Sequence, residues 1–179
     1  MAKAALFIIG GFEETEAVTT IDLLRRGGVD TSVVSLDPDI LVKGSHGIEI
    51  KADILLADAD LPSFDILVIP GGTIAYLDHA PFMEAVLLAA KAGKRLAAIC
   101  AAPSVLGALG LVKGKKAVCY PGFEERLVGA TIVKDPVVTD GLVTTSRGPA
   151  TAVAFALELL RLLAGDKTAA KVKSGILSA

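Results

Sequence analysis

Cys100 is the residue of this sequence best suited to covalent chemistry. It ends the apolar run 95–100, which reads as a buried strand, and a helical run begins soon after it at Pro103. A residue just before a helix faces unpaired N–H groups and the positive end of the helix dipole, which stabilise a thiolate. We therefore predict that Cys100 is a nucleophile with a lowered pKa, held in a strained backbone conformation. The alternative is a small core residue, because cysteine is often buried.

Glu16 is a second candidate, in the acidic cluster at the start of the first predicted helix. Glu13 and Glu14 are explained by the helix dipole, which favours acidic residues in a first turn. Glu16 differs because Ala17 and Val18 follow it where the helix turns toward the core. A carboxyl in a poorly solvated pocket has a raised pKa, and when neutral it can donate a hydrogen bond to a thiolate or a sulfinate. Glu16 is thus either an acid beside the thiol or, like Glu13 and Glu14, a carboxylate that interacts with the positive end of the helix dipole.

Two glycines follow the predicted strand 65–70. Gly71 and Gly72 could form only a tight turn, because glycine adopts backbone conformations that other residues avoid. They could also allow a backbone N–H group to approach an oxyanion. Both interpretations remain open from the sequence.

Few other residues could assist Cys100. A Cys-His-Glu triad needs a histidine that reaches the thiol, and the sequence holds only His46 and His79. We expect His46 at a hairpin tip and His79 in a loop before a helix, both solvated. Cys119 lies within the run 115–120 with no helix start directly after it, so we interpret it as structural. These positions argue against a conventional cysteine protease.

The elements that must position these residues alternate between strand-like and helical runs. Predicted strands lie at 3–9, 31–36, 65–70, 95–100, 115–120 and 131–134, with a hairpin at 137–146; predicted helices lie at 15–28, 82–93, 103–110, 149–165 and in the tail. This alternation predicts an α/β fold, a mostly parallel sheet with helices on both faces. Ligands of such sheets bind beyond the carboxyl ends of the strands. The acidic cluster, the two glycines and Cys100 are therefore expected to converge.

Helical spacing also predicts which side of the first helix is buried. Val18, Ile21 and Leu24 recur at that spacing and predict one apolar face, to which Ala17 could also belong. At the other end of the chain, Gly165 predicts the C-terminal cap of the helix at 149–165.

Composition excludes several classes of protein and of site. The chain has 179 residues, 53% of them hydrophobic and 21% charged, with a formal net charge of −2, which favours one globular domain over a disordered or nucleic-acid-binding chain. Two cysteines and two histidines, all dispersed, do not predict a structural zinc site or a disulfide framework. No G-x-G-x-x-G follows a strand, no stretch is long and apolar enough to span a bilayer, and the N-terminus reads as a strand. We expect a cytoplasmic protein with no metal, cofactor, nucleic-acid or membrane partner.

Four motifs together resemble a known group. "GFEETEAVTTIDLLRRGG", "ILVIPGG", "AAICAAP" and "TTSRGPATAVAFAL" occur in that order and cover the chain almost end to end. The sequence resembles the ThiJ/PfpI superfamily, in the branch of the Parkinsonism-associated deglycase and its bacterial ThiJ-type relatives. The resemblance implies a single domain over 1–179, a flavodoxin-like three-layer sandwich and a homodimer.

The resemblance also implies roles for individual residues. Cys100 would be the reactive, oxidation-prone cysteine, and Glu16 the protonated acid hydrogen-bonded to it. Gly72 and Ala101 would supply N–H groups of an oxyanion type, next to Gly71. Three further matches would form the pocket rim or a dimer contact: Arg147, Gly148 and Pro149.

Departures from the family pattern bear on the expected chemistry. Tyr120 stands where some relatives carry histidine, and Ala101 stands where protease-like relatives carry histidine, which weakens a protease assignment. His46 stands where the family often has arginine; it could face a partner's pocket but is a cation only when protonated.

Two function classes follow. In the first, the protein is an enzyme that acts without a cofactor on a small dicarbonyl or a glycated protein, with Cys100 attacking a carbonyl and Glu16 moving the proton. In the second, it is a redox sensor or redox-regulated chaperone in which Cys100 is oxidised and Glu16 stabilises the sulfinate.

Overall fold

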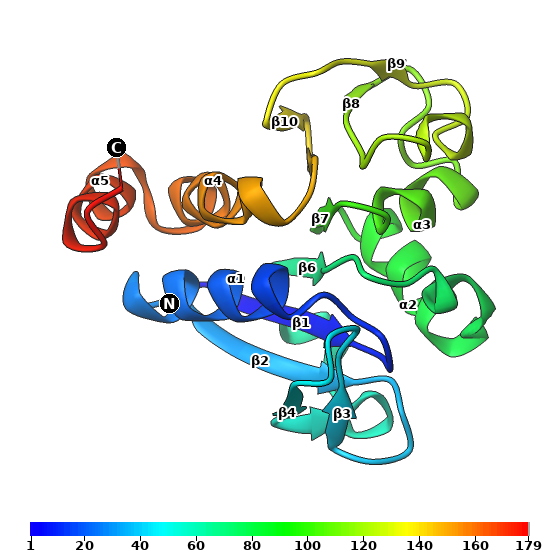
Figure 1. Cartoon of the computed structure of the whole chain (residues 1–179), viewed down its shortest axis with the longest axis horizontal. Helices are drawn as coiled ribbons and strands as arrows, with labels where there is room; N and C mark the ends of the chain where they lie inside the picture. The colour runs from blue at the N-terminus through cyan, green and yellow to red at the C-terminus, as the bar shows by residue number, and fades with distance from the viewer. Residues whose placement is uncertain (179) are drawn as a thin grey trace.

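A seven-stranded sheet forms the centre of the molecule, which a computed structural model describes over residues 1–178 (Figure 1). The strand order is β10-β11-β7-β6-β1-β2-β5, and every pairing is parallel except that of β10 with β11. The strands are β1 (Lys3–Ile8), β2 (Asp30–Ser35), β5 (Ile54–Leu55), β6 (Ile66–Ile69), β7 (Arg95–Ile99), β10 (Val137–Asp140) and β11 (Val143–Ser146). This arrangement confirms the predicted mostly parallel α/β sheet.

Helices cover both faces of the sheet (Figure 1). On one side lie α1 (Glu14–Arg26), α4 (Ala152–Ala164) and α5 (Asp166–Gly175), and on the other α2 (Ala80–Lys91) and α3 (Pro103–Ala108). Alternate residues of β1 serve the two cores: Leu6 and Ile8 pack with α1 and α4, whereas Phe7 packs with α2. The fold is the predicted three-layer sandwich.

Shorter elements complete the chain. Two small sheets stand apart from the main one: β3 (Leu41–Lys43) with β4 (Glu49–Lys51), and β8 (Lys116–Ala117) with β9 (Thr131–Ile132). Short 3₁₀ helices lie at Leu56–Asp58, Leu61–Ser63, Ala75–Asp78, Glu124–Arg126 and Pro149–Thr151.

The predicted strands 115–120 and 131–134 were overestimated. Each contributes only two paired residues. After β8, the backbone groups bond elsewhere. The N–H group of Val118 donates to Thr145 Oγ1 at 3.0 Å, and the N–H group of Tyr120 donates to the carbonyl of Cys100 at 2.8 Å. The segment after β8 is therefore tied to the site region instead of extending a sheet.

The buried face of α1 also differs from the prediction. Leu24 and Ala17 are buried as expected, but Val18 is 49% exposed and the unassigned Thr20 is buried in its place. The phase of the helix is set by Glu16, which is fully buried and points toward the sheet edge. A polar residue thus occupies a position that hydrophobic spacing assigns to an apolar one.

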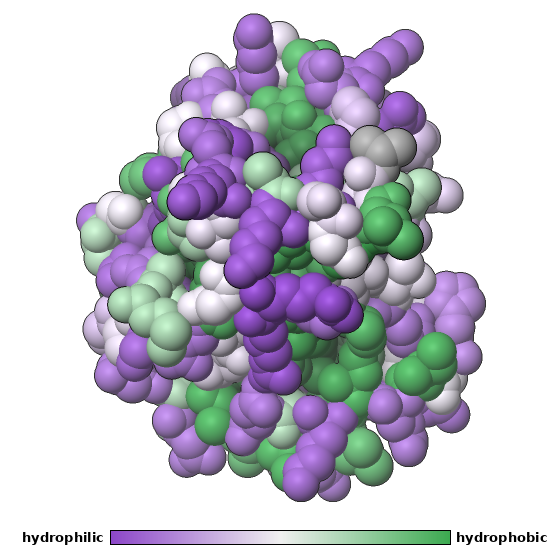
Figure 2. Space-filling model, turned by 90° about the vertical axis from the view of Figure 1, so that its left-hand side faces the viewer, coloured by the Kyte–Doolittle hydropathy of each residue, from purple (hydrophilic) through white to green (hydrophobic). Residues whose placement is uncertain are grey.

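The surface is mixed in character. Hydrophilic side chains cover much of the face drawn in Figure 2, with hydrophobic areas showing between them. No helix within residues 1–178 is long and apolar enough to cross a bilayer.

Gly107 generates a stability prediction for the helix that follows Cys100. A Cβ on Gly107 in α3 would overlap the backbone carbonyl of Arg126, and backbone cannot move aside as a flexible side chain can. We expect Gly107→Ala to lower the free energy of unfolding by about 2 kcal/mol, measured by urea denaturation.

Gly175→Ala is the matched control, because Gly175 closes α5 with no atom within 4 Å of its added Cβ. It should leave stability unchanged or raise it by about 0.5 kcal/mol. Equal losses in the two variants would contradict the assigned packing of α3.

Candidate active site

Cys100 lies at the carboxyl end of β7 in a strained conformation. Its φ is +66°, a left-handed value that residues with a Cβ rarely adopt. Its N–H group donates to the carbonyl of Ser146 at 3.0 Å, and its carbonyl accepts from the N–H group of Tyr120 at 2.8 Å. The predicted strain is confirmed, and backbone bonds on both sides maintain it.

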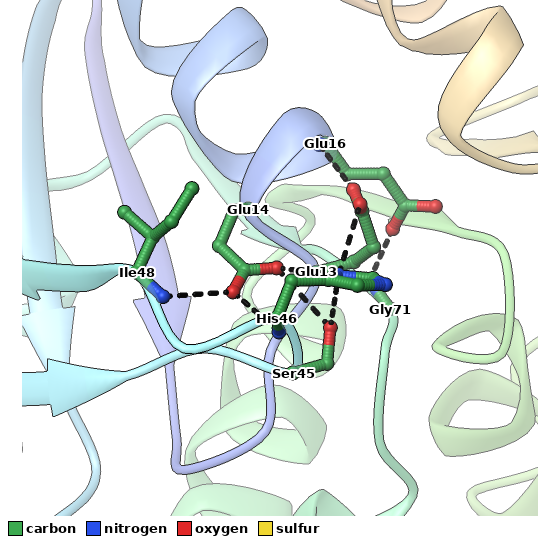
Figure 3. A network of polar contacts seen from close by, with 7 residues as sticks. All are labelled: Glu13, Glu14, Glu16, Ser45, His46, Ile48 and Gly71. Atoms are coloured by element: carbon green, nitrogen blue, oxygen red, sulfur yellow. Dashed lines mark hydrogen bonds and ion pairs between the residues drawn. The ribbon is translucent and has the colours of Figure 1, made fainter.

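Glu16 reaches this turn from the first helical turn of α1. Its side chain is fully buried, and Oε2 accepts a hydrogen bond of 2.6 Å from the N–H group of Gly71 (Figure 3). Among the described residues, Oε1 has no hydrogen-bond partner. Burial raises the pKa of Glu16 to about 7, against the opposing effects of the Gly71 N–H group and the Cys100 thiol. A carboxyl with this pKa is partly protonated at neutral pH.

The pKa of the Cys100 thiol is raised, which overturns the predicted lowering. Burial is the main cause and the Glu16 carboxylate the second; together they bring the pKa to about 12. The N–H groups of Ala101 and Gly72 act on the sulfur in the opposite direction but are outweighed. The helix behind Cys100 has only six residues, so its dipole is weak.

Cys100 and Glu16 therefore share one proton between about pH 7 and 12. When the proton is on Glu16, the carboxylate charge that opposes a thiolate is gone. The N–H groups of Gly72 and Ala101 then remain to stabilise the sulfur anion. In this protonation state the site holds a thiolate beside a neutral carboxylic acid.

The two glycines of the β6–α2 segment fit tightly into this arrangement. A Cβ on Gly71 would lie 2.6 Å from the Cβ of Cys100 and 2.9 Å from Glu16 Oε2. Gly72 has a φ of +88°, and a Cβ there would overlap the backbone of Gly11 and Glu13. A side chain at either position would clash with the residues packed against it. The two glycines therefore allow close packing of the loops, in addition to forming a turn.

The carboxyl ends of β1, β6 and β7 thus bring the predicted residues together. The N–H group of Glu13 donates to the carbonyl of Gly71 at 2.9 Å, which joins the loop after β1 to the loop after β6. Glu13 Oε2 also accepts from the N–H group of Glu16 at 2.7 Å and so caps α1. Sequence reasoning assigned Glu13 to the dipole and missed this positioning contact.

The remaining predicted rim residues form a second group beside the first. Tyr120, Arg147, Gly148 and Pro149 line a shallow groove of about 300 Å³. The Tyr120 ring covers Gly148, where a Cβ would lie 3.1 Å from Tyr120 Cδ2. The backbone of Cys100 links the two groups through its bonds to Ser146 and Tyr120.

His46 lies in the exposed loop between β3 and β4, bonded to Glu14 (Figure 3). Glu14 Oε1 accepts from the backbone of His46 at 2.6 Å and of Ile48 at 3.3 Å, and Oε2 lies 3.0 Å from His46 Nδ1. Burial alone would raise the pKa of Glu14, but the hydrogen bonds with His46 and Ile48 lower it to about 2. Glu14 correspondingly raises the pKa of His46.

Glu14 therefore anchors the loop, a role that its position in a first helical turn does not indicate. Its partners lie 31 to 34 residues away in sequence. Only a tertiary contact could have revealed it.

The other candidate bases and ligands are occupied. His79 caps α2: Nδ1 accepts from the N–H group of Phe82, and Nε2 lies 3.1 Å from the carbonyl of Leu36. It is half-buried, so the prediction of a solvated His79 is wrong. Both of its ring nitrogens contact backbone groups, so neither is free to act as a base for Cys100. Within residues 1–178, Glu13, Glu14 and His46 are the one cluster whose ligand atoms lie within 4.8 Å of one another. A metal there would compete with the hydrogen bonds that hold the loop.

Cys119 has the environment of a core residue. It is 4% exposed and packs in the hydrophobic cluster that contains α2, on the face of the sheet opposite to the cluster of Cys100. Burial, then Glu124, raises its pKa to about 11. It is a suitable internal control for the reactivity of Cys100.

Curated relatives match nearly the whole chain. Protein DJ-1 homolog B of Arabidopsis thaliana is 40% identical over 95% of this chain, which spans 40% of that protein's length. Protein dj-1beta of Drosophila melanogaster is 37% identical over 100% of this chain and 99% of its own. A Caenorhabditis elegans protein named glutathione-independent glyoxalase DJR-1.2 is 36% identical, with 96% and 95% covered.

Solved structures and a family model agree with these relatives. The oxidized form of Toxoplasma gondii DJ-1 superposes with a TM-score of 0.95 at 34% identity, and each chain is covered completely. The model of the DJ-1/PfpI family matches residues 2–162. This chain belongs to the DJ-1/PfpI family.

Proposed function

We propose that the protein is a cofactor-free enzyme that converts reactive dicarbonyls, or their adducts on proteins, by glyoxalase- or deglycase-type chemistry. The observation that carries the proposal is the buried Glu16 carboxyl, half-protonated near neutral pH, against a strained Cys100. The C. elegans relative named a glutathione-independent glyoxalase supports the same chemistry. We propose a stress response as the setting of this activity.

The first chemical step is addition of the thiolate to an aldehyde. The sulfur forms a bond to the carbonyl carbon, the C=O π electrons move to oxygen, and Glu16 gives its proton to that oxygen. The product is a hemithioacetal. The N–H groups of Gly72 and Ala101, which act on the sulfur, are available to the oxyanion as it forms.

Glu16 is a carboxylate after this step and can act as a base. With methylglyoxal, it takes the proton from the former aldehyde carbon, which gives an enediolate, and returns it to the neighbouring carbon. The hydroxyl proton of the hemithioacetal moves to the former ketone oxygen, its C–O bond becomes the C=O of the thioester, and the product is a thioester of lactate. Water then cleaves the thioester and restores the thiol. The overall change is methylglyoxal plus water to lactate, an internal redox reaction that needs no external oxidant.

Cys100→Ser and Glu16→Gln test the assignment. We expect each to lower kcat/KM for methylglyoxal at least about 100-fold, because each removes a group that acts in the transition state. Lactate formation measured enzymatically is the readout. Cys119→Ser is the control and should retain activity, and undiminished turnover in Glu16→Gln would overturn the proposal.

The shared proton predicts an unusual pH profile for alkylation of Cys100. The thiolate fraction should rise through about pH 7, as the pair loses its first proton, stay constant, and rise again only near pH 12. Glu16→Gln removes the carboxylate, so a single titration should remain, with its midpoint below 12. Rates mapped by peptide mass spectrometry give the profile.

The buried Cys119 should show no step near pH 7 and should react only as the pH approaches its own pKa of about 11. A single step between pH 8 and 9 that is identical in wild type and Glu16→Gln would show that the two side chains do not share a proton.

A redox sensor or redox-regulated chaperone is the second candidate. It is favoured by the buried Glu16 Oε1, which has no hydrogen-bond partner within residues 1–178 and, when protonated, could donate to a sulfinate oxygen. The similarity to an oxidized DJ-1 structure favours it too. Two equivalents of hydrogen peroxide would convert the thiol to the sulfinate and release two waters. Protection of client proteins that depends on this oxidation, in a protein without dicarbonyl turnover, would favour the sensor.

We also propose that the protein is cytoplasmic, and that it is a homodimer, as the family resemblance implies. Light scattering coupled to size-exclusion chromatography tests the dimer.

A further inference from the structure

The left-handed backbone of Cys100 is held by bonds from outside its own segment. A residue with a Cβ keeps such a φ only where the surrounding structure enforces it. The N–H group of Cys100 donates to the carbonyl of Ser146, and its carbonyl accepts from the N–H group of Tyr120. Tyr120 is 46% exposed, whereas Ser146 is fully buried. The contacts that fix Ser146 therefore bear on the geometry of the nucleophile.

The side chain of Ser146 is bonded to two neighbours. Ser146 ends β11 opposite Ile99, the residue before Cys100. Its hydroxyl donates to the carbonyl of Pro136 at 2.8 Å, and its Oγ lies 2.7 Å from Oγ1 of Thr151. Pro136 directly precedes β10, and Thr151 directly precedes α4. Contacts from both flanking elements thus meet at the residue that bonds to Cys100.

The donors in this group can be assigned one by one. Ser146 donates its hydroxyl hydrogen to Pro136, so the contact between the two hydroxyls is donated by Thr151. The carbonyl of Gly148 lies 2.8 Å from Thr151 Oγ1, but it already accepts from the N–H group of Thr151. Thr151 Oγ1 itself accepts from the buried N–H group of Gly148 at 3.1 Å. A continuous chain of donors therefore runs from Gly148 through Thr151 and Ser146 to Pro136.

We propose that Thr151 is a positioning residue for the nucleophile: its hydroxyl, acting through Ser146, maintains the left-handed turn at Cys100. The turn has little freedom, because the Cβ of Cys100 and Oε2 of Glu16 both lie within 3 Å of the Cβ position of Gly71. A shift of the turn would therefore change the contact between the thiol and the carboxyl. This inference rests on the proposed function for the reaction that the turn serves.

Alkylation of Cys100 by iodoacetamide tests the proposal without any turnover. Valine at position 151 keeps the branched shape but lacks the hydroxyl. We expect Thr151→Val to lower the rate at pH 8 about 10-fold and to abolish the step near pH 7. Thr151→Ser keeps the hydroxyl without the methyl group, so it should keep the step, at a rate within about 2-fold of the wild type.

Thr139→Val is the matched control, since Thr139 also joins a hydroxyl of β11 to a residue of α4. Its Oγ1 lies 3.0 Å from Thr144 Oγ1 and donates to Glu158 Oε1 at 2.8 Å. Within residues 1–178, neither threonine bonds to Cys100. The control should leave the step near pH 7 unchanged. An equal loss in Thr139→Val would overturn the proposal, as would a Thr151→Ser variant that reacts as slowly as Thr151→Val.

Hydrogen exchange in the wild type tests the same chain even if a variant fails to fold. Within residues 1–178, the N–H group of Gly148 donates only to Thr151 Oγ1. We expect the amides of Gly148 and Cys100 to exchange slowly and with similar protection, because the same chain of bonds holds both. Fast exchange at Gly148 beside a protected Cys100 would show that the turn is held without Thr151, which would overturn the proposal.

Turnover separates this inference from the proposed function. Suppose that Thr151→Val loses the alkylation step in a protein that converts no dicarbonyl. The positioning role would then be retained and the enzyme overturned. A profile like that of the wild type in Thr151→Val, in a protein whose lactate formation depends on Cys100 and Glu16, would retain the enzyme and overturn the positioning role.

Discussion

The arrangement of the site depends on burying one carboxyl group, that of Glu16, at the edge of the sheet. Burial of a carboxylate is costly unless the group is hydrogen-bonded or neutral. Glu16 meets both conditions in part: Gly71 donates to one oxygen, and the raised pKa allows a proton at the other. The phase of α1 follows from this buried group. Glu16 also contributes to the need for glycine at position 71, together with Cys100, and to the raised pKa of the Cys100 thiol, after burial of the thiol itself.

The pKa of the Cys100 thiol depends more on burial and on Glu16 than on the helix that follows it. A strand-to-helix turn is expected to activate a thiol through backbone dipoles. Here desolvation and a neighbouring carboxylate are larger, and they raise the thiol pKa. Activation therefore depends on where a single proton resides, which differs physically from a cysteine whose thiolate is stable by itself.

Much of the fold could be predicted from the sequence because the buried strands β1, β6 and β7 are continuous apolar runs bounded by turn residues. The convergence of Cys100, Glu16 and Gly71 followed from the rule for carboxyl ends of parallel strands. Hydrophobic spacing placed Val18 inside, since it could not anticipate that a carboxyl would occupy the core side of α1. The anchor role of Glu14 and the direction of the Cys100 pKa depend on tertiary contacts and desolvation, which no local pattern encodes.

The loops around Cys100 are joined to one another largely through main-chain groups. Gly11 bonds to Lys43, Glu13 to Gly71, and Tyr120 to Cys100, in each case from an N–H group to a carbonyl. Bonds of this kind do not depend on side-chain identity. The scaffold can therefore keep its geometry when the side chains around the turn are exchanged. Because these main-chain bonds hold the loops, substrate choice can diverge in evolution while the turn that carries Cys100 stays the same.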